Sequence, residues 1–228
     1  MMMRNKLNFG LLVILLSASV AGCMYKGEGI DNAAARKVTW FSFLAGDDIK
    51  ASCHANAPDQ VRVVYNGQWR EQVRIYELGL KAPRQLDQRV IGTGSLTSIT
   101  TDDLLAPWRG ATASASLPAE MNDQLMSAFA DSGAFGPPAI GLQMPSDGYY
   151  WTAASCYHGS YHFTAWLYPQ DAFQKLTFPK ALLGLDATKV AFNEPHPIDS
   201  TELVSESRRR AENERWYIKV GANGLVGN

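Results

Sequence analysis

The segment DGYYWTAASCYHGSYHFTAWLYP (residues 147–169) is rich in aromatic and small residues on both sides of a His-Gly step. This pattern predicts a β-hairpin, closed either by His158 and Gly159 alone or by the four residues 157–160. Both loops pair Cys156 with Tyr161, so Cys156 lies on one face of the ribbon. The opposite face carries the larger aromatic set, namely Tyr149, Trp151, His162, Trp166 and Tyr168.

This aromatic face allows two interpretations. It can pack under a helix or a second sheet, because the six Trp residues of the chain need apolar surroundings. It can also be exposed as a stacking platform for a sugar ring, a glycan strand or a partner loop, with His162 as a polar handle. The sequence leaves both interpretations open, and the five residues are candidate binding residues.

The same segment holds one cysteine and two histidines, but the hairpin separates them. His158 lies in the turn, and His162 lies four residues further along a strand, which is about 13 Å and too far for two ligands of one zinc ion. Cys156 and His162 face opposite sides of the ribbon, which argues against a Cys-His nucleophile pair. We therefore assign no metal ligand, no cofactor and no catalytic residue here.

A second hairpin is predicted at residues 61–78, VRVVYNGQWREQVRIYEL. A three-residue loop at 66–68 pairs Val61 with Val73 and gathers the apolar residues on one face, with Arg62 and Arg74 on the other.

The remaining patterns indicate short strands and two helices. We expect strands at 37–44, 174–178, 188–192 and 215–220, and helices at 118–131 and 199–213. The fold class is α+β, predominantly antiparallel hairpins with one or two helices, in a single domain over residues 37–228.

The N-terminus carries a targeting signal. Arg4 and Lys6 precede the apolar run FGLLVILL, and small residues lead to Cys23. The run VAGC (residues 20–23) resembles the lipobox of bacterial lipoproteins. The resemblance implies that residues 1–22 are a signal peptide, that Cys23 is acylated and anchors the chain in a membrane, and that residues 23–36 form a lipidated tether. Met24 after the cysteine resembles the sorting pattern of outer-membrane lipoproteins, so we expect a periplasm-facing domain on the outer membrane.

In such an oxidising compartment the two remaining cysteines, Cys53 and Cys156, are most simply a disulfide. The alternative is a reactive thiol, which needs a reducing environment.

The charge pattern excludes nucleic acid as a partner. The chain has 21 Lys and Arg against 22 Asp and Glu, and no basic face or arm stands out. We expect a non-enzymatic envelope lipoprotein that binds a protein partner or a cell-wall glycan. The alternative is a cell-wall hydrolase, or an inhibitor of one, with Glu71, Asp102 or Asp103 as candidate carboxylates. A pair of carboxylates about 5–10 Å apart in a cleft would favour the enzyme.

Overall fold

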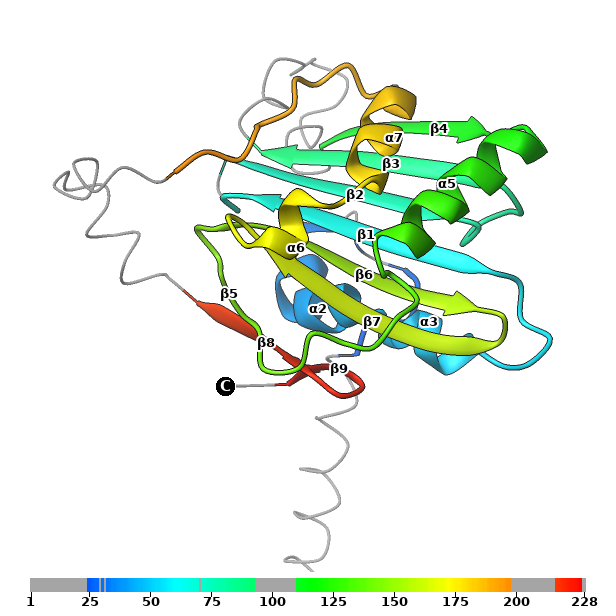
Figure 1. Cartoon of the computed structure of the whole chain (residues 1–228), viewed down its shortest axis with the longest axis horizontal. Helices are drawn as coiled ribbons and strands as arrows, with labels where there is room; N and C mark the ends of the chain where they lie inside the picture. Colours follow the sequence, from blue (N-terminus) through cyan, green and yellow to red (C-terminus); the bar gives the residue numbers. More distant parts are fainter. Residues whose placement is uncertain are drawn as a thin grey trace, which may run out of the picture.

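A computed structural model describes residues 24–28, 30, 32–69, 71–92, 110–197 and 216–226. In these residues the chain forms a six-stranded antiparallel sheet in the order β4-β3-β2-β1-β6-β7 and a small sheet in the order β5-β8-β9 (Figure 1). The strands are β1 Gln60–Gly67, β2 Gln72–Leu78, β3 Gln85–Gly92, β4 Ala111–Ser116, β5 Gln143–Pro145, β6 Tyr149–Tyr157, β7 Ser160–Leu167, β8 Tyr217–Gly221 and β9 Gly224–Val226. The helices are α2 Ala33–Ala45, α3 Asp47–Ser52, α5 Ala119–Asp131, α6 Asp171–Gln174 and α7 Phe178–Leu185. The expected α+β class with a mainly antiparallel sheet is confirmed.

The large sheet has a covered core on each face. Helices α5 and α7 lie over one face, and α2, α3 and the small sheet lie over the other (Figure 1). Leu125 of α5 and Phe178 of α7 pack with Val61 and Val63 of β1. Phe43 of α2 packs on the other side with the remaining inward residues of β1, β2 and β6. The central strands are therefore buried on both faces.

The β6–β7 hairpin has the expected register. Cys156 pairs with Tyr161, and Trp151 pairs with Trp166. His158 and Gly159 form the two-residue turn, with φ values of 50° and 72° that match the left-handed turn favoured between twisted strands. A Cβ at Gly159 would lie 2.5 Å from the Cα of Ala55, so the chain cannot carry a larger residue there without a shift.

The register expected for the β1–β2 hairpin is wrong. Val61 pairs with Leu78 rather than Val73, and the connecting loop is residues 68–71. The shift is an odd number of residues, so Val73 moves to the face opposite Val61. The prediction assumed one apolar and one polar face, whereas this strand pair is buried on both faces and its pattern does not distinguish them.

The strand expected at residues 37–44 is also wrong, because this segment belongs to helix α2. Phe43 and Leu44 are buried, and Trp40 packs one turn earlier on the same side. This spacing is helical, and it outweighs the β-propensity of the aromatic residues.

Two further expected strands are absent from the described residues. Residues 174–178 contain the end of α6 and the start of α7. Residues 188–192 form no strand and are not part of either sheet. The helix at α5 and the strand at β8 are confirmed. The helix expected at 199–213 lies outside the described residues.

The segment expected to be a tether is partly packed. Tyr25 and Ile30 are buried, and α2 begins at Ala33. The backbone N–H of Tyr25 donates to Ser42 Oγ at 2.9 Å, and the Tyr25 ring meets Phe43 edge-on with centroids 4.9 Å apart. The packed part of the described chain therefore includes Tyr25, which is two residues after Cys23 in the sequence.

Candidate functional site

The aromatic face of the β6–β7 hairpin is buried, so the exposed platform is corrected to a packed core. Trp151 is 1 % exposed and Trp166 is 6 % exposed. Both rings pack against Phe178 of α7, at centroid distances of 5.2 and 5.4 Å. The predicted pairing was right, and of the two interpretations the structure shows packing under helices.

The other members of this face lie at its two ends. Buried Tyr149 meets Tyr168 edge-on at 6.2 Å, and its hydroxyl is 2.6 Å from His196 Nε2. His162, at the turn end, is half-buried near Phe135, and burial lowers the pKa of its imidazole. The five candidate residues therefore do not form one accessible surface.

The Cys53–Cys156 disulfide is present. It links the segment between α3 and β1 to the end of β6. The Cα atoms are 5.4 Å apart, an ordinary spacing for a disulfide. Cys156 lies on the face opposite Trp151, as the hairpin register predicted, and this is the face that α2 covers. Cys23, the candidate lipidation site, lies outside the described residues.

Of the three candidate carboxylates, only that of Glu71 belongs to the described residues. Asp102 and Asp103 lie outside the described residues. Glu71 lies in the β1–β2 loop, where its Oε2 accepts a hydrogen bond from Asn193 Nδ2 at 2.9 Å. This contact ties the loop to the segment after α7.

Arg62 is a buried cation on the α2 face of the sheet. The sequence pattern predicted that it shares one polar face of the hairpin with Arg74. Its guanidinium binds Asp48 of α3 in a bidentate manner at 2.7 and 2.8 Å and Glu77 of β2 at 2.7 Å. The guanidinium also lies over the Phe43 ring, 4.0 Å from its centroid. These contacts join α2 and α3 to the sheet, so Arg62 is a structural cross-link.

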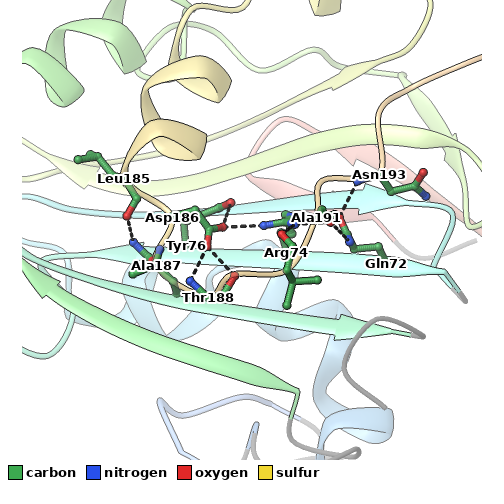
Figure 2. A network of polar contacts seen from close by, with 11 residues as sticks. Gln72, Arg74, Tyr76, Leu185, Asp186, Ala187, Thr188, Ala191 and Asn193 are labelled. Atoms are coloured by element: carbon green, nitrogen blue, oxygen red, sulfur yellow. Dashed lines mark hydrogen bonds and ion pairs between the residues drawn. The ribbon is translucent and has the colours of Figure 1, made fainter. Parts of the chain in front are cut away.

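Arg74 makes the corresponding network on the opposite face, shown in Figure 2. It donates to Asp186 Oδ2 at 2.6 Å, to Gln72 Oε1 at 2.8 Å, and to the carbonyl oxygens of Val190 and Ala191. Tyr76 donates its hydroxyl to the same carboxylate oxygen of Asp186 at 2.5 Å. The network holds the segment after α7 against the sheet.

Asp186 is ionised in this setting. Burial alone raises the pKa of its carboxyl, but hydrogen bonds from Thr188 and Tyr76 and the charge of Arg74 outweigh that effect and lower the pKa below its ordinary value. Its side chain is 7 % exposed. The sequence reasoning missed this pair, because the two residues are far apart in the chain and have no motif between them.

A surface cleft that the sequence reasoning also missed lies beside α5, and we name it the Tyr157 cleft. It has a volume of about 580 Å³. It is formed where α5 meets the β2–β3 turn, the β6–β7 turn and the start of β1. Its lining residues are Pro58, Asp59, Leu78, Gly79, Pro83, Arg84, Asn122, Asp123, Met126, Ser127, Ala130, Tyr157 and His158.

The walls of the Tyr157 cleft are fixed by contacts of their own. Tyr157 stacks on Phe135 with ring centroids 3.9 Å apart and planes 10° from parallel. Asp59 Oδ1 accepts the backbone N–H of His158 at 2.7 Å, which joins the start of β1 to the hairpin turn. Arg84 has a positive φ of 56°, and its carbonyl accepts the N–H of Leu117. The cleft therefore presents charged, amide and aromatic groups on walls whose positions these contacts hold.

The described residues contain no cluster of three or more His, Cys, Asp or Glu side chains that could hold a metal ion. In the same part of the chain, every helix is too short or too polar to cross a bilayer. Comparisons of the chain with protein families, with curated proteins and with solved structures gave no match.

Proposed function

We propose that this protein is a bacterial envelope lipoprotein that is acylated at Cys23, faces the periplasm from the outer membrane, and binds a cell-wall glycan in the Tyr157 cleft. The observation that carries the binding role is the composition of that cleft. The disulfide supports the compartment, because such bridges persist in oxidising surroundings.

The chemistry of the Tyr157 cleft suits sugar hydroxyls, each of which donates and accepts hydrogen bonds. Arg84 supplies donors, Asp59 and Asp123 supply acceptors, and Asn122 supplies both. Asn122 is half-buried on α5, where its amide donates to Asp123 at 3.3 Å. Met126 and Tyr157 provide apolar surface for the ring carbons.

Cosedimentation with purified cell-wall sacculi tests this proposal. We expect the Asn122→Ala/Asp123→Ala variant to bind about tenfold more weakly or worse, because it loses two side chains able to hydrogen-bond the glycan at about 0.5–1.5 kcal/mol each. Gln124→Ala is the matched control, an exposed residue of the same helix outside the lining. Unchanged binding by the double variant would reject the glycan site.

The alternative role is hydrolysis of the same polymer, because Asp59 and Asp123 both line the Tyr157 cleft. Release of soluble glycan fragments from sacculi, abolished by Asp59→Asn or Asp123→Asn, would establish this alternative. The anchor is tested separately by the intact mass of the purified protein, which should contain the added mass of acyl groups on Cys23.

A further inference from the structure

A second depression, which we name the Phe41 groove, lies on the opposite face of the large sheet between α2 and the small sheet. It has a volume of about 450 Å³ and is mostly apolar. Its lining residues are Phe41, Ser42, Ala45, Asp47, Trp216, Tyr217, Ile218, Leu225 and Val226. Phe41 and Trp216 meet edge-on across it, with ring centroids 5.3 Å apart.

The rim of the Phe41 groove exposes several large apolar side chains. Phe41 is 48 % exposed, Tyr217 is 41 % exposed and Val226 is 45 % exposed. Val38, one turn before Phe41 on the same helix, is 61 % exposed. Soluble proteins seldom gather this much exposed apolar surface without a partner for it.

The chain itself connects the Phe41 groove to the proposed anchor. Ser42, a lining residue, accepts the hydrogen bond from the backbone of Tyr25. Cys23 is two residues before Tyr25, a span of at most about 7 Å. The chain between an acylated Cys23 and the Tyr25 backbone is therefore too short for a free tether.

The charges around the groove complement an anionic surface. Lys37 is exposed next to Val38, and Lys219 pairs directly with Val226 across β8 and β9. Within the groove the one carboxylate, that of Asp47, accepts a hydrogen bond from the Ser42 hydroxyl at 2.5 Å. Lysines beside apolar residues can bury their stems in the interface and keep the ammonium groups at headgroup level.

We propose that the Phe41 groove rests on the bilayer that holds the Cys23 lipid, with its apolar rim in the boundary between headgroups and acyl chains. This proposal rests on the proposed acylation of Cys23. Aromatic side chains such as Phe41, Trp216 and Tyr217 favour that boundary. Helices α2 and α5 cover opposite faces of the large sheet (Figure 1). A membrane contact at α2 therefore leaves α5, which forms one wall of the Tyr157 cleft, on the face turned away from the bilayer.

Tryptophan fluorescence of the full acylated protein tests the proposal. The protein is placed in vesicles of phosphatidylethanolamine and phosphatidylglycerol whose acyl chains are brominated, with unbrominated vesicles as reference. We expect bromine to quench emission from Trp216, so the Trp216→Phe variant should show less quenching than wild type. The Phe41→Ser/Val226→Ser variant should show the same decrease in quenching as Trp216→Phe. Met121→Ser is the matched control, an exposed apolar residue of α5 that should change nothing.

The outcomes separate this inference from the anchor. Acylated protein whose Trp216 is not quenched would overturn the membrane contact while leaving the lipoprotein proposal standing. If the intact mass shows no acyl group, both the anchor and this inference fail, because no lipid on Cys23 then holds the groove at a bilayer. A dimer in light scattering that the Phe41→Ser/Val226→Ser variant abolishes would identify a second copy as the occupant and overturn the proposal.

Discussion

Replacing Asp186 with alanine should destabilise the fold by about 3–5 kcal/mol, the range found when one partner of a buried ion pair is removed. The change leaves the Arg74 guanidinium, which is 1 % exposed, without its counter-charge. It also removes the acceptor of the Tyr76 hydroxyl and of the Thr188 N–H and hydroxyl. For a domain of this size the melting temperature should fall by roughly 6–20 °C.

The pH dependence adds a second expectation for the same residue. The pKa of Asp186 is lower in the folded protein than in the unfolded chain. Its ionised carboxylate therefore adds to the free energy of unfolding above about pH 4, and this stabilisation is lost as the pH falls through the pKa of the folded state. Urea unfolding at pH 7, 5, 4 and 3 should show the gap between wild type and Asp186→Asn shrinking toward the lowest pH.

A paired substitution distinguishes a buried charge from a mere loss of packing. Arg74→Met/Asp186→Leu removes both charges and should be more stable than either single variant, because no unpaired ion remains. The reasoning is refuted if Asp186→Ala costs less than about 1 kcal/mol, or if the double variant loses the full sum of the two single losses.

Three further substitutions test other parts of the fold. Cys53→Ala/Cys156→Ala should lose up to about 4–5 kcal/mol, since it opens a bridge across 103 residues of sequence; wild type in reductant should match it in urea unfolding. Gly159→Ala should cost more than about 1 kcal/mol, because of the positive φ and the close approach to Ala55; a melting curve close to wild type would contradict this. Ser155→Ala should be neutral or slightly stabilising, since the buried Ser155 Oγ has no hydrogen-bond partner among the residues that the structure describes, and calorimetry measures the difference.

The sequence predicted the β6–β7 hairpin well because its turn residues and its alternation of side chains both indicate the same register. Only one register places His158 and Gly159 in the turn, and the disulfide partner Cys156 then falls on a definite face. The same reasoning failed for β1 and β2, where the pattern predicted that Arg62 and Arg74 share one polar face. Arg62 binds Glu77 within the same hairpin, but its second carboxylate, Asp48, and the carboxylate bound by Arg74, Asp186, come from other elements. A pattern within one hairpin cannot include those two residues.

The candidate site was harder to predict than the fold. The aromatic residues Trp151 and Trp166 drew attention by composition, but large aromatic side chains are as typical of a core as of a binding surface. The Tyr157 cleft combines residues from four parts of the chain, including Asp59 and Asn122. Such a cleft depends on which turns pack against one helix, and the spacing of residues within a short segment does not predict those contacts.

The Cys53–Cys156 bridge also determines what a protease can release. The β2–β3 turn is a reasonable place for a first cut, since Lys81 in it is 65 % exposed. That turn lies between the two cysteines, so both fragments would stay covalently joined after cleavage. A nicked molecule would migrate as an intact chain on a non-reducing gel and separate into two bands only after the thiols are reduced.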